Sequence, residues 1–335
     1  MKEITGISLI AFKKPDRFVE FYRGEMNRLP EKPVFELSYK MDAEYLQKVA
    51  DINAPVVSAH VPCPFTDTMP NLGSRDPMVL QESLDIIEAS ARTVAAFGGD
   101  VVVLHSGYAT DSRIYTDFSL RREHLEQEIR GFEQHILKDE GKVSGASYCD
   151  TPKYRLHMEQ TINNLPRAIE VCKKHGVFLA VENLNPRITY LMQRPEDLLH
   201  TFNRVPGAYF CLDFGHLWLS SIAHKFNYFS AVEALLHTGR VLTTHMHNNK
   251  SVVGEVESIS DSHLGLENGN IPYAGVFEAI GECRVAQLGR GSRLQAQQGL
   301  REQSGQPDTP GRFILETEEL PVESFKALHT YLKSK

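Results

Sequence analysis

Apolar residues follow two alternating patterns from one end of the chain to the other. Short runs rich in β-branched residues are separated by longer segments in which apolar residues recur every three or four positions, most clearly in Pro77–Phe97 and Ile162–His175. The short runs predict strands and the longer segments predict helices. The predicted strands are Ile4–Phe12, Pro33–Tyr39, Pro55–Val61, Val101–Ser106, Val177–Leu184, Ala208–Phe214, Val241–His247 and Phe313–Thr317.

Eight strands, nearly all followed by a helix, predict an α/β fold: a single closed parallel (β/α)8 TIM barrel. The remaining barrel helices are expected at Asp42–Asp51, Pro195–Asn203, Phe229–Thr238, Tyr273–Glu282 and Pro321–Ser334. An open doubly wound sheet is the competing fold, but no Gly-x-Gly-x-x-Gly follows the first strand. We therefore expect one barrel domain over residues 1–335.

Two segments are longer than the connections that a barrel needs. Residues 107–176, after the fourth strand, contain a helical pattern at Arg121–Leu137 and a turn-rich stretch, Asp139–Asp150, before the barrel helix. This insertion would lie over the carboxyl ends of the strands, so we interpret it as a lid, with a surface decoration as the alternative. Residues 284–312, before the eighth strand, are rich in Gln, Gly and Arg and predict a flexible loop.

Composition excludes several classes of protein. Hydrophobic residues make up 41% of the chain and the net charge is −7, which excludes intrinsic disorder. The excess of acidic over basic residues argues against a nucleic-acid partner, although a groove that is basic only locally remains an alternative. Five widely spaced cysteines without a C-x-x-C pair favour a reducing compartment. With no leader-like start and no apolar run of roughly 18 residues, we expect a cytoplasmic protein that does not span a membrane.

Histidines and carboxylates gather at the predicted strand ends, whose side chains meet at one mouth of a barrel. One histidine at a strand end is usually a hydrogen-bonded core residue, but four carboxylates in one mouth would repel each other unless a cation lay among them. Imidazoles and carboxylates together are the ligands of Zn²⁺, Mn²⁺ and similar ions, so we predict a divalent metal site. The residues concerned are His60, His105, Glu182, Asp213, His216, His245, His247, Asp261, His263 and Glu316.

The chain resembles the xylose-isomerase-like barrel superfamily, which contains sugar isomerases and epimerases as well as the family-two apurinic endonucleases. The most specific pieces are Cys211-Leu212-Asp213-x-x-His216, His245-Met246-His247-Asn248-Asn249, and Asp261-x-His263 leading into Gly269-Asn270-Ile271. In the isomerase branch the resemblance implies one metal ion (Mn²⁺, Zn²⁺ or Mg²⁺) on Glu182, Asp213, His245 and Glu316, with His216 touching the substrate. In the endonuclease branch it implies three zinc ions, with additional ligands His60, His105, His216, Asp261 and His263.

Two mechanisms compete for this mouth. As a sugar, sugar-phosphate or polyol isomerase or epimerase, the enzyme would use Glu182 and Glu316 to move a proton on and off carbon. As a zinc phosphodiesterase of the endonuclease type, it would activate water for attack on phosphate. We favour the isomerase, because the long segment after His105 would crowd a DNA duplex and the endonuclease pattern expects other residues at His247, Asn248 and Cys63.

Other residues beside the ligands are candidates to bind a small carbohydrate: His247, Lys250, Asn183 and Trp218, together with His216. Each has an alternative role in orienting ligands or packing the core. Glu36, at the end of the second strand, could face the mouth or cap a helix. A non-enzymatic role is a further alternative: the barrel would hold a structural metal ion in closed coordination and act as a binding module. The sequence leaves the oligomeric state open, with a homo-oligomer among the alternatives.

Overall fold

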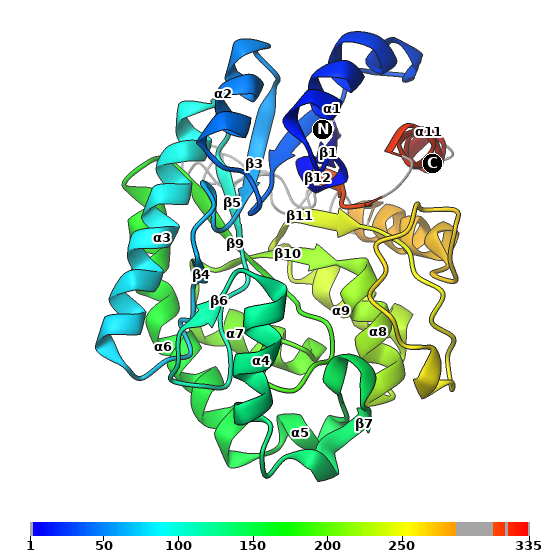
Figure 1. Ribbon diagram of the computed structural model, residues 1–335. Helices are drawn as coiled ribbons and strands as arrows, with labels where there is room; N and C mark the ends of the chain where they lie inside the picture. Colours follow the sequence, from blue (N-terminus) through cyan, green and yellow to red (C-terminus); the bar gives the residue numbers. More distant parts are fainter. Residues whose placement is uncertain (1–2, 286–310, 319–320, 334–335) are drawn as a thin grey trace, which may run out of the picture.

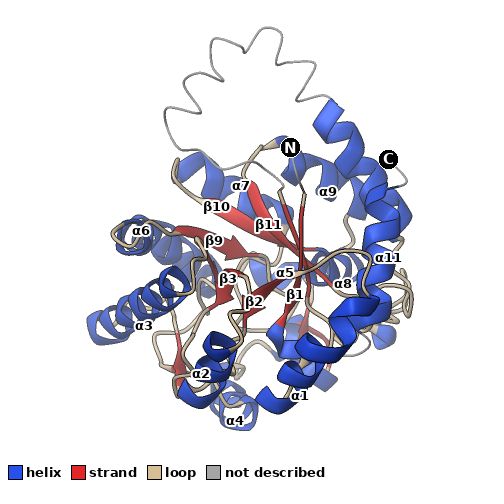
Figure 2. Cartoon of the chain, turned by 90° about the horizontal axis from the view of Figure 1, so that it is seen from above, coloured by secondary structure: helices blue, strands red, loops and turns tan. Residues whose placement is uncertain are grey.

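A computed structural model describes residues 3–285, 311–318 and 321–333. Eight parallel strands close into a barrel in the order β1-β12-β11-β10-β9-β5-β3-β2, which confirms the predicted fold class. Figure 2 shows the strands as a ring surrounded by helices. The barrel strands are β1 (Ile4–Ser8), β2 (Val34–Leu37), β3 (Val56–His60), β5 (Val101–Leu104), β9 (Phe178–Glu182), β10 (Tyr209–Asp213), β11 (Val241–Met246) and β12 (Arg312–Leu315).

The strands are buried on both faces, because helices cover the outside of the barrel and side chains fill its interior. All four residues of β5 and all six of β11 are buried. β5 is a continuous apolar run, as expected for a parallel strand covered on both faces, whereas β11 also buries Thr243, Thr244 and His245. The helices are α1 (Pro15–Glu20), α2 (Ala43–Asp51), α3 (Pro77–Ala96), α4 (Phe118–Glu128), α5 (Ala146–Cys149), α6 (Pro152–Lys173), α7 (Pro195–Arg204), α8 (Phe214–His224), α9 (Tyr228–His237), a helix over residues 273–285, and α11 (Pro321–Lys333) (Figure 1).

Helices α6 and α8 are among those that differ from the prediction, each for a physical reason. Helix α6 begins at Pro152, ten residues before the predicted start at Ile162, because the hydroxyl of Thr151 caps it and Pro152 is suited to a first turn. Helix α8 was not predicted. All eleven of its residues are buried, so it has no polar face and no helical periodicity to detect.

The predicted insertion after the fourth barrel strand folds against the barrel (Figure 1). Its strand β6 (Ile114–Tyr115) pairs with β4 (Thr68–Met69), and its hairpin joins β7 (Ile136–Lys138) to β8 (Val143–Ser144). The predicted helix Arg121–Leu137 is wrong in its second half, because α4 ends at Glu128 and β7 follows. The ammonium of Lys138 donates to two carbonyl oxygens of the loop before Asp261, each at 2.9 Å.

The predicted flexible loop at residues 284–312 lies almost entirely outside the described residues. Within the described part of the chain, none of the helices has the length and apolar character needed to cross a membrane.

Candidate metal centre

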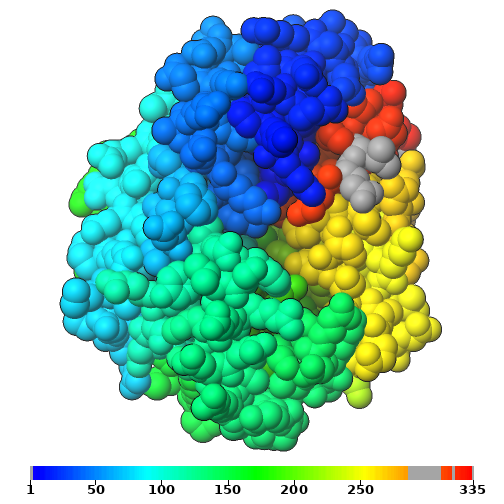
Figure 3. Space-filling view, viewed as in Figure 1, coloured from blue at the N-terminus to red at the C-terminus, as the bar shows by residue number. Residues whose placement is uncertain are grey.

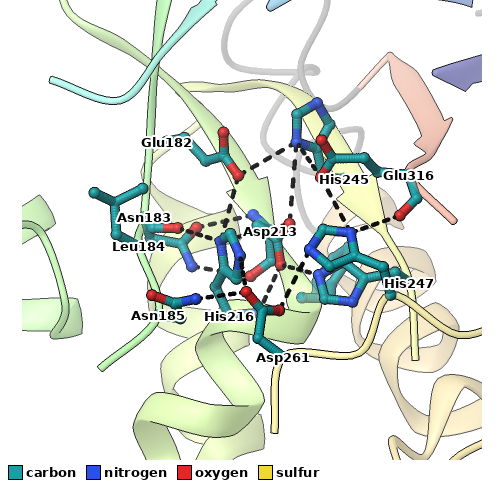
Figure 4. A network of polar contacts seen from close by, with 12 residues as sticks. Glu182, Asn183, Leu184, Asn185, Asp213, His216, His245, His247, Asp261 and Glu316 are labelled. Carbon is teal, nitrogen blue, oxygen red and sulfur yellow. Dashed lines mark hydrogen bonds and ion pairs between the residues drawn. The ribbon is translucent and has the colours of Figure 1, made fainter. Parts of the chain in front are cut away.

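Four predicted ligands meet at the carboxyl ends of neighbouring barrel strands. Glu182, Asp213 and His245 lie at the ends of β9, β10 and β11, and Glu316 directly follows β12. One ligand atom from each lies within 4.8 Å of the others, and all four side chains are buried. Figure 4 shows the carboxylates of Glu182 and Glu316 on either side of the His245 imidazole. The structure thus brings together the group that the resemblance assigned to one metal ion.

Local structure leaves one oxygen of Asp213 unused. Asp213 is the N-cap of α8, and its Oδ1 accepts a hydrogen bond from the backbone N–H of His216 at 2.6 Å. Its Oδ2 is buried without a hydrogen-bond partner. The Asn183 side chain accepts from the Asp213 N–H at 2.8 Å and donates to its carbonyl oxygen at 2.9 Å, which fixes the end of β10.

Glu36 faces the centre from the end of β2, which decides between its two predicted roles. Its Oε1 lies 2.9 Å from Nε2 of His245, and its Oε2 accepts a hydrogen bond from Ser58 at 2.8 Å. The other ring nitrogen of His245, Nδ1, lies 3.3 Å from both Glu182 and Glu316. A carboxylate behind a ligand histidine orients the ring and increases the basicity of the ligand nitrogen.

Four imidazoles surround Glu182. Its Oε2 lies 3.2 Å from Nε2 of His60 and 3.3 Å from Nε2 of His105, while its Oε1 lies 3.3 Å from Nδ1 of both His216 and His245. Glu182 therefore belongs to three candidate ligand groups: the four-residue group above, a group with His60 and His105, and a group with Cys211 and His245. If ions were bound by these groups, the Glu182 carboxylate would be available as a ligand to more than one of them.

A further group combines His216, His247, Asp261 and His263, again with ligand atoms within 4.8 Å. The rings of His247 and His263 stack with centroids 3.8 Å apart. Gly215 makes room for His247, because a Cβ at this glycine would lie 2.1 Å from the imidazole. His247, predicted as a substrate contact, is fully buried here, and its Nε2 lies 3.2 Å from Oδ1 of Asp213.

Burial and ion pairing oppose each other in this cluster. Burial would lower the pKa of His263, but the Asp261 carboxylate outweighs burial and raises that pKa to about 10. Burial would likewise lower the pKa of His216, yet Asp213 and Asp261 raise it well above its usual range. At His105 burial outweighs the opposing effect of the Glu182 carboxylate and lowers the pKa to about 4. Burial would raise the pKa of Glu182, but the surrounding histidines hold it well below its ordinary value.

The donor set fits a divalent cation. Oδ2 of Asp213 is buried without a hydrogen-bond partner. Oε2 of Glu182 and Oδ1 of Asp261 are buried with only imidazole nitrogens beside them, at 3.2 to 3.3 Å, and a bound ion would satisfy these oxygens. Mixed carboxylate and imidazole donors suit Zn²⁺ or Mn²⁺. Cys211 also lies within reach of Glu182 and His245, but burial raises the pKa of its thiol well above normal and so disfavours the thiolate that binds metals.

A cavity of about 610 Å³ opens above the centre and is bordered by the insertion. Its lining includes the predicted ligands His60, His105, His216, Asp261, His263 and Glu316. Figure 3 shows a hollow on this face, bounded by the teal and green surface of the insertion and by the yellow segment opposite. That the insertion closes over a substrate stays a prediction.

Not every predicted substrate contact reaches this cavity. Trp218 lies outside its lining, with Nε1 donating to the carbonyl of Ser251 at 3.0 Å, and Lys250 is exposed outside the lining as well. Conversely, the lining includes residues that the sequence analysis did not single out, among them Tyr39, Arg121 and Arg187. They come from distant segments, and no local motif marks them.

Comparison with known families gives one match that covers most of the chain. A family model described as "Xylose isomerase-like TIM barrel" matches residues 17–284. No curated protein matches the sequence at a significant level.

Solved structures of sugar epimerases share the fold. A D-tagatose 3-epimerase-like protein is 18% identical with a TM-score of 0.64, and the match covers 100% of this chain and 98% of that one. The D-allulose 3-epimerase of Methylomonas sp., solved with D-allulose, is 12% identical with a TM-score of 0.60 over 100% and 98% of the two chains. The 3-keto-D-glucoside 4-epimerase of E. coli is 13% identical with a TM-score of 0.58 over the full length of both chains.

The raised pKa values of His216 and His263 predict that metal binding depends on pH. A metal ion must displace the protons of these imidazoles, so affinity falls as pH falls below the raised pKa values. Between pH 8 and pH 6 we expect Zn²⁺ affinity to fall about tenfold per pH unit for each displaced proton. Competition with a colorimetric chelator measures the affinity, and calorimetry in buffers of different ionisation enthalpy counts the protons released. An affinity independent of pH would contradict the prediction.

Proposed function

This chain belongs to the xylose isomerase-like TIM barrel family, and we propose that it is a divalent-metal-dependent isomerase or epimerase of sugars, sugar phosphates or polyols. The observation that carries the proposal is the group of Glu182, Asp213, His245 and Glu316, with four ligand atoms within 4.8 Å beside an open cavity. The epimerase names of structures with the same fold support the same class of reaction.

The proposed reaction removes a proton from a carbon next to a carbonyl group. A divalent ion held by Glu182, Asp213, His245 and Glu316 would polarise the carbonyl and the neighbouring hydroxyl of the sugar, which acidifies the C–H bond. Glu316 is the better placed base, because its carboxylate lines the cavity. It would take the proton as a carboxylate and return it as a carboxylic acid, with a substrate enediolate between the two steps.

Glu182 decides between the two outcomes of this chemistry. A single base that returns the proton to the adjacent carbon gives an isomerase, whereas inversion at one carbon needs a proton donor on the opposite face. Glu182 is on the opposite side of His245 from Glu316, which suits it to that second role. Its four imidazole neighbours hold it ionised, so it would gain a proton only from the substrate or through one of those histidines.

Deuterium uptake tests the role of Glu316. The metal-loaded protein is incubated in D₂O with ketoses, ketose phosphates and inositol derivatives, and NMR follows deuterium at carbon. We expect uptake with the wild type and a loss of about 10³-fold in Glu316→Gln, because the amide cannot accept the proton. Glu278→Gln, which removes an exposed charge from the helix over residues 273–285, should exchange at the wild-type rate.

Metal content is measured on each variant, so that loss of a ligand is separated from loss of a base. Exchange that persists in metal-loaded Glu316→Gln would refute the role of this residue. Absence of exchange with the whole panel in the metal-loaded wild type would count against the isomerase.

A zinc-dependent phosphodiesterase of the apurinic endonuclease type is the second candidate, and a specific observation favours it. Glu182 is shared with His60 and His105, and His216, His247, Asp261 and His263 form a further group, so the centre has donors for more than one ion. Clustered zinc ions could activate water and neutralise a phosphodiester. The insertion that borders the cavity is the observation against it, because a duplex would need that space.

Abasic-site DNA tests this second candidate directly. If the zinc-loaded protein is a phosphodiesterase, it nicks such DNA at physiological salt, and His105→Ala loses at least about 100-fold of that rate because the second ligand group is broken. His135→Ala changes a half-buried histidine of the insertion that contacts Ser147 and lies outside the candidate ligand groups, and it serves as the control. Our ranking predicts no nicking by the wild type, and nicking that depends on His105 would reverse it.

A further inference from the structure

We propose that the substrate carries an anionic group, a phosphate or a carboxylate, which Arg121 and Arg187 bind at the edge of the cavity above the metal centre. This inference rests on the proposed isomerase or epimerase function and narrows its substrates to anionic carbohydrates. The two arginines come from different parts of the chain, Arg121 from α4 of the insertion and Arg187 from the loop between β9 and α7.

The guanidinium of Arg121 is packed against groups that do not neutralise it. It lies over the ring of Phe118 at 5.6 Å, and its Nη1 is 2.8 Å from the sulfur of Met69. Its Nε is buried without a hydrogen-bond partner. The ionisable groups that interact with it most strongly are the phenols of Tyr190, Tyr108 and Tyr39. Burial raises the pKa of Tyr39 and of Tyr108 above the usual value, so these two phenols stay neutral at pH 7 and do not neutralise the guanidinium.

Arg187 approaches the same place from the barrel side. Its guanidinium lies 5.8 Å from the ring centre of Phe118 and 6.0 Å from that of Tyr190. Two guanidinium groups thus lie against one phenyl ring, and aromatic contacts of this kind hold an arginine in position while its N–H groups stay available. Paired arginines in such an arrangement match the oxygen atoms of phosphate and carboxylate groups.

Neither arginine has a carboxylate partner. Within the described ranges, no Asp or Glu oxygen lies within 4.0 Å of the guanidinium of Arg121 or Arg187. By contrast, Arg113, on the same insertion, pairs with Glu82 at 2.6 Å. A partly buried cation without a counterion is costly, and the cost is removed if the ligand supplies the anion.

The position of the two arginines links them to the metal centre. Both line the 610 Å³ cavity together with His105, Asp261 and Glu316. Both also line an adjoining cavity of about 280 Å³ that Asp261 shares. A carbohydrate whose reacting carbon lies beside Glu316 can therefore extend its anionic end toward Arg121 and Arg187. A metal ion would neutralise the carboxylates of the metal centre below. The other charged residues of the lining are Lys40, Asp117 and Glu318, and neither Asp117 nor Glu318 forms an ion pair with Arg121 or Arg187.

Binding to three ketoses with the same carbon skeleton tests the proposal: D-fructose, D-fructose 6-phosphate and D-fructuronate, with inorganic phosphate as a probe without a skeleton. Dissociation constants are measured by calorimetry on the Mn²⁺-loaded protein at 0.15 M NaCl. We expect at least one anionic probe to bind about 30-fold or more tightly than fructose. Preference for the phosphate or the carboxylate then identifies which anion the site takes.

Matched variants assign that preference to the two arginines. Arg121→Met and Arg187→Met should each weaken the anionic probe about 10- to 100-fold and leave fructose within twofold. Arg121→Lys keeps the charge and should retain part of the preference, which separates loss of binding from loss of fold. Arg113→Met, whose arginine lies on the insertion but outside both cavity linings, should bind as the wild type does.

The outcomes separate this proposal from the proposed function. If deuterium exchange occurs but anion binding does not depend on Arg121 or Arg187, the anionic substrate is refuted and the isomerase function is retained. If anion binding depends on the two arginines but no substrate shows exchange, the anion site is retained and the isomerase function is refuted. If neither the sugar anions nor inorganic phosphate at 20 mM bind more tightly to the wild type than to the Met variants, the anion site is refuted.

Discussion

The convergence of buried carboxylates at one end of a closed barrel is the constraint on which the rest of this structure depends. Glu36, Glu182, Asp213 and Glu316 meet there because parallel strands in a barrel end at a common mouth. Their charges would disfavour folding unless they were compensated, since a buried carboxylate without a partner costs several kcal/mol. The histidines supply part of the compensation, and the oxygens left without partners are placed for a cation.

Much of this arrangement could be predicted, because the apolar runs mark the strands and the carboxyl ends of parallel strands meet at one mouth. The four ligands of the core group lie at or directly after the ends of such runs, so predicting the strands also predicted that these residues meet. Glu36 could not be decided from the sequence, since its direction depends on a register shift between Phe35 and Glu36 where β2 pairs with β3. Arg121 and Arg187 gave no signal, because only the folded insertion brings them to one cavity.

The asymmetry between the two glutamates connects the structure to its chemistry. Glu316 is open to the cavity, whereas every oxygen of Glu182 faces two imidazole nitrogens. The solved epimerases share the fold at 12% to 18% identity, which does not transfer a substrate or a mechanism to this chain. Whether the substrate is a sugar or a phosphodiester therefore depends on this chain's own residues. The two deciding properties are the number of metal ions that the histidines bind and the anionic group that Arg121 and Arg187 bind.

The content of tightly bound metal tests the account most directly. The protein is dialysed against Mn²⁺ and Zn²⁺, desalted and analysed by mass spectrometry of the metal, with thermal unfolding before and after chelation. We predict at least one ion per chain, loss of that ion in Asp213→Asn, and a lower melting temperature after chelation, since an ion at 100 times its Kd stabilises by about 2.7 kcal/mol. Protein that retains no ion and melts at the same temperature with and without chelator would contradict the account.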